Sequence, residues 1–265
     1  MTEAKAKALV NVSRKVSDRN AADSIQALLP LIFPEPEYFE QGKPSLERSI
    51  KVCFEPGCIP KPKGPPDNPR LQALLASLEA PPTPHLDVAF GIENSSWSAL
   101  EAFINDEINE LYGRLAHPFG VIATSYPFLI TQWTSQAAGG NQFQAANQAA
   151  SGGAALLGNM QKLLAATADT CSLTEEDRTH LNTVFSVTTD SESVHIYVHW
   201  SEPIPGTSDR SYEMSIVKRV MLDCPDMFPA MQRMVNNIID WGLLERRAAI
   251  KKVIALQMAQ IDRSS

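Results

Sequence analysis

Three carboxylates crowd one short stretch of the sequence, residues 105–110 (NDEINE), and this spacing is the strongest candidate for chemistry. Asp106 and Glu110 are four residues apart and Glu107 and Glu110 are three apart, so on a helix these pairs share one face. Like charges at such spacings repel by roughly a few tenths of a kcal/mol per pair unless a cation lies nearby. That cation would be a metal ion, an arginine guanidinium or a substrate amine. The alternative is a solvated helix face without a chemical role.

Seven further polar residues are candidates for binding or chemistry by their type or position. His195 and His199 share one face of a strand, which is how a strand presents two metal ligands, although a pair on a hairpin surface has the same pattern. Asn147 and Gln148 lie on a helix expected to face the site, where their amides could orient a ligand or bridge parts of the structure. Ser135, Ser151 and Thr134 are nucleophile candidates by residue type alone, because no Gly-x-Ser-x-Gly turn surrounds them.

The elements that position these residues follow from the periodicity of apolar side chains. Strands are expected over residues 86–92, 128–133, 183–189, 194–200 and 212–222. Helices are expected over residues 20–33, 96–112, 142–166 and 225–261. For the first helix, Asp23 or Ser24 is a plausible N-cap. A turn at residues 190–192 predicts a hairpin, and the order of elements predicts an α/β fold with a mixed central sheet flanked by helices.

Residues 33–84 are dense in proline, and each proline removes a backbone donor and fixes φ. This composition predicts a long irregular arm, interrupted by one helix at about residues 69–79. We therefore expect residues 1–83 to form an N-terminal helix and a proline-rich arm packed on the core. Residues 84–265 are expected to form the α/β core with a long C-terminal helix, in one structural domain.

The bulk composition excludes several classes of protein. Hydrophobic residues make up 44% and charged residues 20% of the 265, which is typical of a globular chain. No apolar run approaches the roughly 20 residues of a membrane-spanning helix, and the N-terminus lacks a signal-peptide core, so we expect a cytoplasmic protein without a membrane partner. Neither a disulfide nor a zinc pattern is expected from the four cysteines, which are Cys53, Cys58, Cys171 and Cys224.

The charge distribution bears on nucleic-acid binding. A net charge of −7 argues against a broad grip on phosphates, which depends on many Lys and Arg contacts. A local cluster on the last helix, formed by Arg246, Arg247, Lys251 and Lys252, is either a basic patch or a solvated helix face.

Four segments in order resemble the fungal branch of the PD-(D/E)XK nuclease-like superfamily. They are residues 84–91 (PHLDVAFG), 126–134 (YPFLITQWT), 145–154 (AANQAASGGA) and the hairpin end 197–200 (YVHW). The resemblance covers roughly residues 80–220 and implies a nuclease-like core. In active members an Asp and a Glu on adjacent strands hold a divalent metal, and a Lys two residues on stabilises or activates the nucleophile.

This chain departs from that catalytic set. Asp87 matches the Asp, but Gln132 stands at the Glu position and Thr134 at the Lys position. An amide oxygen is a neutral and poorer ligand for Mg²⁺ than a carboxylate, and a hydroxyl carries no positive charge. We therefore expect no bound metal, no other cofactor and no metal-dependent phosphodiester cleavage. Mg²⁺-stimulated cleavage abolished by Asp87→Ala would restore the nuclease interpretation.

The acidic stretch also resembles the Asp-Asp-x-x-Glu motif of fungal arginine-containing cyclodipeptide synthases, with Glu107 in place of the second Asp. The resemblance implies an enzyme of secondary metabolism that draws two amino acids from aminoacyl-tRNAs, arginyl-tRNA among them, and closes them into a diketopiperazine. Asp106, Glu107 and Glu110 would bind or deprotonate the amino-acid part. Asp87, Gln132, Thr134, Asn147 and Gln148 would line the substrate site. The alternative function is a catalytically inactive nuclease-like domain that binds nucleic acid or protein.

Overall fold

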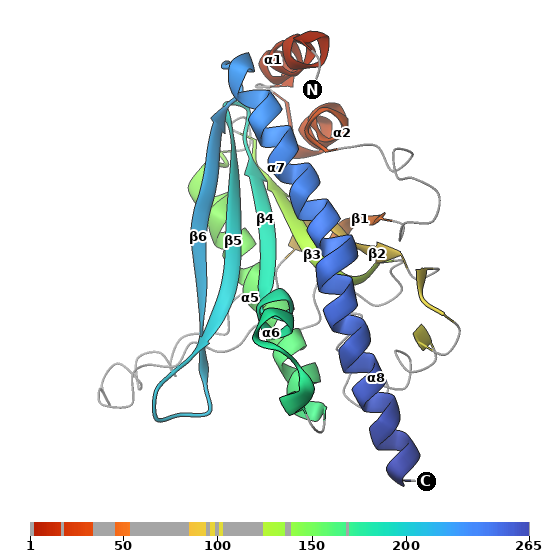
Figure 1. The fold of residues 1–265 in the computed structure, drawn as a ribbon. Helices are drawn as coiled ribbons and strands as arrows, with labels where there is room; N and C mark the ends of the chain where they lie inside the picture. Colours follow the sequence, from red (N-terminus) through yellow and green to blue (C-terminus); the bar gives the residue numbers. More distant parts are fainter. Residues whose placement is uncertain are drawn as a thin grey trace.

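Six strands form one sheet whose spatial order follows the chain (Figure 1). They are β1 (Leu46–Cys53), β2 (His85–Glu93), β3 (Thr124–Trp133), β4 (Thr183–Thr189), β5 (Ser193–Pro203) and β6 (Arg210–Met221). The computed structural model describes residues 3–16, 19–33, 46–53, 85–93, 96–98, 101–102, 124–135, 139–167 and 170–264. β3 and β4 pair in parallel, whereas β1–β2, β2–β3, β4–β5 and β5–β6 are antiparallel. The sheet is therefore mixed, as expected.

A helical crossover joins the two parallel strands, because parallel neighbours cannot be linked by a tight turn. It contains α5 (Gln142–Ala166), a 3-10 turn (Thr170–Ser172) and α6 (Glu175–Leu181). Small residues let α5 lie close against one face of the sheet. A Cβ added at Gly152 would come within 2.7 Å of the Leu86 side chain, and one at Gly153 within 2.4 Å of the His199 ring.

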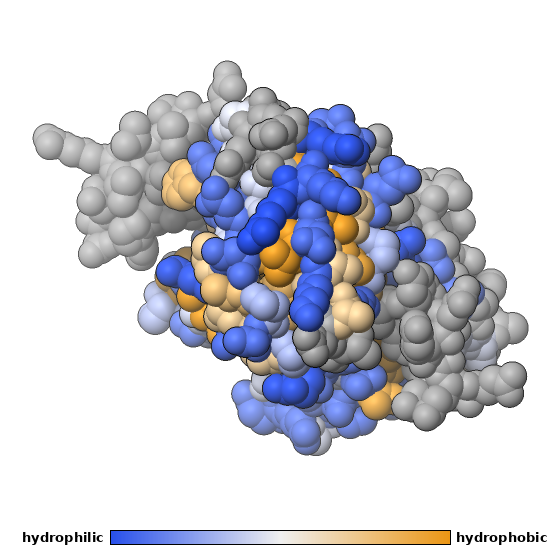
Figure 2. All heavy atoms as spheres, turned by 90° about the horizontal axis from the view of Figure 1, so that it is seen from above, coloured by the Kyte–Doolittle hydropathy of each residue, from blue (hydrophilic) through white to orange (hydrophobic). Residues whose placement is uncertain are grey.

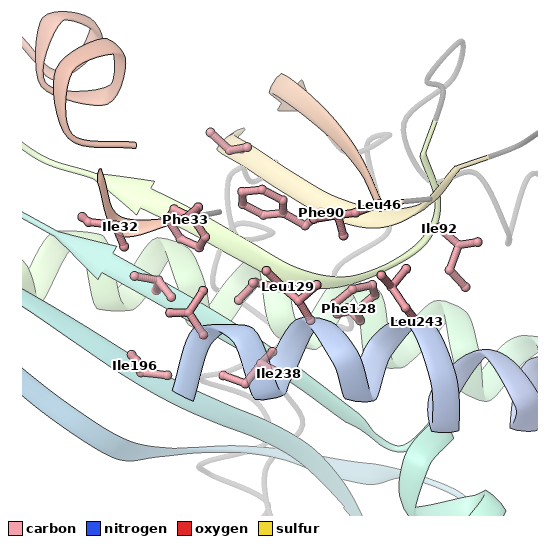
Figure 3. Close-up of a cluster of buried hydrophobic side chains, with 14 of the residues drawn as sticks. Ile32, Phe33, Leu46, Phe90, Ile92, Phe128, Leu129, Ile196, Ile238 and Leu243 are labelled. Carbon is pink, nitrogen blue, oxygen red and sulfur yellow. The ribbon is translucent and has the colours of Figure 1, made fainter. Parts of the chain in front are cut away.

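The opposite face of the sheet is covered by the C-terminal helix (Figure 1). α7 (Phe228–Trp241) runs through a π-helical turn (Gly242–Arg246) into α8 (Arg247–Ser264). Figure 3 shows the main hydrophobic core at this interface, where Phe128 and Leu129 of β3 meet Leu243 of the π-helical turn. The contact is so close that a Cβ at Gly242 would lie 2.3 Å from the Phe128 ring. None of the helices in the described ranges combines the length and hydropathy needed to cross a membrane.

Two N-terminal helices, α1 (Glu3–Val16) and α2 (Ala21–Ile32), lie at the end of the sheet where α7 begins (Figure 1). Asn20 caps α2 by accepting a hydrogen bond from the backbone N–H of Asp23. Phe33, just after α2, stacks on Phe90 of β2 with ring centroids 4.8 Å apart. Seen from this end, the surface shows blue polar side chains around patches of orange apolar atoms (Figure 2).

Most of the expected elements are confirmed, with four differences. Residues 46–53, expected in an irregular arm, form β1 and pair with β2. α1 and α6 were not expected. The N-cap of α2 is Asn20 rather than Asp23 or Ser24. The C-terminal helix is interrupted by its π-helical turn. The helix expected at about residues 69–79 and most of the helix expected over 96–112 lie outside the described residues.

Candidate functional site

The carboxyl ends of β3 and β4 define the most promising location for a site. Ligands of open α/β sheets bind beyond the carboxyl ends of parallel strands, where the crossover helix begins. β3 ends at Trp133 and β4 at Thr189, and the backbone N–H of Thr134 donates to the Thr189 carbonyl at 2.9 Å. α5 begins eight residues after Thr134, at Gln142, so its first turn lies over these strand ends.

Strand register aligns five polar residues across the sheet at this end, and we call them the polar row. Gln132 pairs with Thr188, Thr188 with His195, and His195 with Arg219. Residues directly opposite one another on neighbouring strands project from the same face of a sheet. Since Val88 pairs with Thr131, the same antiparallel register places Asp87 opposite Gln132.

Asp87 is fixed at one end of the polar row. Its Oδ2 accepts a hydrogen bond from the backbone N–H of Trp133 at 2.7 Å, which ties the carboxylate to the neighbouring strand. Arg219 stands at the other end, four strands away. With strands about 4.8 Å apart, the row spans about 19 Å and carries one negative and one positive terminus.

The centre of the polar row is closed within the protein. Gln132 and Thr188 are 1% and 0% exposed, whereas Asp87 and His195 are half-buried and Arg219 is exposed. Gln142 covers the centre from α5: its Oε1 accepts from the Thr188 hydroxyl at 2.6 Å. Its Nε2 donates to the backbone oxygen of Ser193 at 3.0 Å. The charged ends, rather than the middle, are therefore the parts that a ligand can reach.

His195 is the titratable group inside the polar row. Burial lowers its pKa first, and the neighbouring Arg219 lowers it further, while Asp190 acts in the opposite direction. Its Nδ1 lies 3.2 Å from the Tyr197 hydroxyl, which holds the ring against the strand. Because the pKa is lowered overall, the imidazole is neutral at neutral pH. One of its ring nitrogens can then donate a hydrogen bond and the other can accept one.

His199 is more deeply buried than His195, although both project from the same face of β5. It is 1% exposed and its Nε2 lies 2.7 Å from the Ser186 hydroxyl. Burial lowers its pKa to about 4. Neither a pair of metal ligands nor a pair on the hairpin surface describes this arrangement. Among the residues that the structure describes, no three His, Cys, Asp or Glu side chains gather closely enough to hold a metal ion.

The structure describes three of the remaining expected site residues, Thr134, Asn147 and Gln148. Asn147 and Gln148 are exposed on α5, whereas Ala145 and Ala149 of the same turns are buried, so the structure does not bring the two amides to the row. Thr134 lies at the end of β3, and its buried hydroxyl has no hydrogen-bond partner among the described residues. Asp106, Glu107 and Glu110 lie outside the described residues.

The two serines considered as nucleophiles have structural roles. The Ser135 hydroxyl donates to the backbone carbonyl of Arg19, joining the end of β3 to the segment before α2. Ser151 donates to the carbonyl of Asn147 one turn earlier in α5, at 3.1 Å.

Each member of the basic cluster has a partner within the protein, although Lys252 keeps 54% of its side chain exposed. Arg246 is 1% exposed and donates from Nη1 to three backbone carbonyls, those of His180, Leu181 and Thr183, at 2.8–3.2 Å. Because α6 ends at Leu181, these bonds satisfy carbonyls that the end of a helix leaves without partners. Lys252 forms an ion pair with Asp177 at 2.6 Å. α6 therefore contacts α8 near its start, through Lys252, and the π-helical turn at its end, through Arg246.

Arg247 and Lys251, the other two members of the basic cluster, contact residues that precede the acidic stretch in the sequence. Arg247 donates to the carbonyl of Ser96 at 2.6 Å, and its guanidinium lies 5.3 Å from the centroid of the Trp97 ring. Lys251 pairs with Glu101 at 2.8 Å. α8 therefore contacts Ser96, Trp97 and Glu101, and Glu101 is five residues before Asp106.

Comparison with known proteins places the chain in a family. No curated protein and no solved structure matches it. The family DUF7924, described as a domain of unknown function, matches residues 8–254, a span that contains all six strands, α5 and the whole polar row. This match covers most of the sequence, and the chain therefore belongs to the DUF7924 family.

Proposed function

We propose that this chain is a tRNA-dependent cyclodipeptide synthase of the arginine-containing type, built on a nuclease-like core that has lost its metal set. The observation that carries the proposal is the polar row, in which a carboxylate and a guanidinium stand at opposite ends of a neutral centre. A ligand suited to such a row has a cationic group at one end and a phosphate toward the other. An aminoacylated RNA terminus has both.

The Asp87 end of the row supports the nuclease-like core. Asp87 and Gln132 lie on neighbouring strands, β2 and β3, as the resemblance requires of the Asp and Glu positions. Gln132 contributes an amide rather than a second carboxylate, and one Asp87 oxygen already accepts from the Trp133 backbone. Mg²⁺ prefers carboxylate oxygens and needs near-ideal octahedral geometry, so this pair is poorly suited to hydrolytic metal chemistry.

The chemistry of an aminoacyl ester fits a site of this kind, because the ester is already activated. The α-amine of one aminoacyl group attacks the ester carbonyl of the other, an amide bond forms, and the 3′-hydroxyl of one tRNA leaves with a proton. A second attack of the same type closes the ring and releases the second tRNA. A carboxylate that accepts the ammonium proton and binds a guanidinium serves both steps. Asp87 is suited to this role, and Asp106, Glu107 and Glu110 are proposed to share it.

The direct test is expression of the chain in a bacterial host, followed by mass spectrometry of the medium for arginine-containing diketopiperazines. We expect a product mass that depends on the chain and disappears in Asp106→Ala and Glu110→Ala variants. Purified protein given arginyl-tRNA with a second aminoacyl-tRNA should release the same product without ATP. Absence of product from soluble, folded protein given a full set of aminoacyl-tRNAs would contradict the proposal.

The second candidate is a catalytically inactive nuclease-like domain that binds nucleic acid or protein. The burial of Gln132 and Thr188 favours it, because the closed centre of the polar row limits access to the strand ends. This candidate predicts RNA or protein binding without any cyclic product. The same mass-spectrometric experiment, combined with a binding measurement, separates the two functions.

A further inference from the structure

Phe143, in the first turn of α5, exposes 74% of its surface, the largest fraction among the exposed large hydrophobic side chains of the described part of the chain. The residue before it, Gln142, reaches into the polar row through Thr188 and bonds to Ser193 at the start of β5. Phe143 therefore directly follows the residue that covers the centre of the polar row. Burying an exposed aromatic ring against a flat partner is favourable, so a ring left open at this place suggests a binding surface.

The part of α5 around Phe143 carries polar amides and no negative charge. The chain has 30 acidic residues in 265, yet the 25 residues of α5 include none. Gln144 and Asn147 are exposed on the first turns of the helix, and Asn147 is one turn after Phe143, on the same side. The positive end of the helix dipole favours an anion at this turn, whereas the carboxylates of Asp190 and Glu192, in the turn before β5, oppose one. A single ring among amides is unlike the contiguous apolar surface of a typical protein interface.

A positive charge lies in the same polar row, one strand beyond His195. Arg219 is exposed on β6, directly opposite His195 of the polar row. It forms no ion pair with any residue in the described ranges. The positive charge of Arg219 acts on the polar row, because it contributes to the lowered pKa of His195. An aromatic ring, amides and an arginine without an ion-pair partner are the groups that bind single-stranded nucleic acid by stacking, base-edge hydrogen bonds and phosphate contact.

We propose that Phe143, the amides of Gln144 and Asn147, and Arg219 bind the single-stranded 3′ end of an RNA. A terminal base stacks on the Phe143 ring, and Arg219 contacts a phosphate of the same strand. The inference rests on the proposed function for its choice of RNA, and it assigns the part of the substrate that lies outside the reacting amino acids. The RNA end would run along α5 and place its aminoacyl group toward the polar row.

The test uses the full chain and a fluorescein-labelled RNA hairpin with a deacylated single-stranded ACCA 3′ overhang, with the same hairpin lacking the overhang as reference. Fluorescence anisotropy should show tighter binding of the overhang RNA. Phe143→Ala should weaken that binding about 5- to 150-fold, the range expected for one stacked base, whereas Phe143→Trp should retain it. Arg219→Ala should weaken binding and reduce the slope of log Kd against log salt by about 0.7, as for one lost phosphate contact on a single strand.

The C-terminal helix offers two matched controls. Leu244→Ala, in the π-helical turn, removes an exposed apolar side chain, and Arg263→Ala, in α8, removes an exposed basic one. Neither variant should alter RNA binding. Glu192→Gln, which removes an exposed carboxylate in the turn before β5, should strengthen binding. Equal affinity of Phe143→Ala, Arg219→Ala and the unchanged protein, or no preference for the overhang, would overturn the inference.

The binding assay uses deacylated RNA, so its outcome is independent of product formation. Overhang binding that depends on Phe143, together with no cyclic dipeptide, would support this inference and contradict the proposed function. Full product formation by the chain, with Phe143→Ala and Arg219→Ala unchanged in both RNA affinity and KM for aminoacyl-tRNA, would support the proposed function and contradict this inference.

Discussion

Acidification from pH 7 to pH 5 should lower the stability of the fold, because His199 is buried. Its ring is enclosed by β4 and α5, with Ser186 at 2.7 Å from Nε2 and Gly153 directly over the ring. Burial lowers its pKa from 6.5 to about 4. The perturbation is acidification from pH 7 to pH 5, compared between the natural protein and His199→Gln. A glutamine amide does not titrate and can still bond to the Ser186 hydroxyl.

The size and sign of the effect follow from the two pKa values. Between pH 6.5 and pH 4 the unfolded chain binds a proton at His199 and the folded protein does not, so acidification favours unfolding. The gap of about 2.5 between the pKa values corresponds to a limit of about 3 kcal/mol. At pH 5 most of this has developed, and the natural protein should lose about 2 kcal/mol of unfolding free energy more than His199→Gln does.

Urea unfolding at pH 7, 6 and 5, followed by tryptophan fluorescence, measures this difference directly. The free energy of unfolding of the natural protein minus that of His199→Gln should fall by about 2 kcal/mol from pH 7 to pH 5, whatever the stability of the variant at pH 7. His195→Gln is the matched control on the same strand, and it should give a smaller change because that ring is only half-buried. Parallel pH profiles for the natural protein and His199→Gln would refute the reasoning, because they would mean that the His199 ring is solvated or already charged in the fold.

Three further predictions follow from particular contacts. Gly242→Ala should lower the free energy of unfolding by about 1–3 kcal/mol, because the new methyl would lie 2.3 Å from the Phe128 ring, and Phe128→Leu in the same chain should recover part of the loss in urea unfolding. Arg246→Ala should lower the free energy of unfolding by about 2–6 kcal/mol, since the carbonyls of His180 and Leu181 lose their donor and a buried unsatisfied acceptor costs about 1–3 kcal/mol. A thermal unfolding temperature equal to that of the natural protein would contradict this. Asp87→Asn keeps an oxygen for the Trp133 N–H, so it should leave stability within about 0.5 kcal/mol while reducing product formation. Unchanged product yield from Asp87→Asn would show that its charge has no part in the reaction.

Sequence patterns predicted the elements whose side chains alternate or cluster regularly. The bounds of α5 and β4 agree with expectation, because a long run of small and apolar residues and a compact β-branched run have clear periods. β1 was missed because its sequence, LERSIKVC, is short, carries three charges and lies among prolines. An edge strand of this kind is stabilised by pairing with β2 rather than by local preference. The π-helical turn had no local signal, since it depends on the fit between Gly242 and Phe128.

The candidate site was predicted only where motif residues lie on neighbouring strands. Asp87 and Gln132 were expected together, and the structure places them on β2 and β3. Thr188, Gln142 and Arg219 were not expected, because strand register and a helix crossover bring them to the same end of the sheet from distant parts of the sequence. The basic cluster of α8 was misjudged for the same reason: its partners, such as Asp177 and Ser96, lie some 75 to 150 residues away.

α7 and α8 follow all six strands in the sequence, and this order has a consequence for synthesis in the cell. They leave the ribosome after the whole sheet, so Phe128 and the other apolar residues that they cover stay open to solvent while the sheet is being made. Segments that depend on them, such as α6, gain their anchors only after Arg246 and Lys252 emerge. A nascent chain of this kind is exposed to aggregation until these helices have emerged, and chains truncated before α7 should be captured by chaperones or degraded.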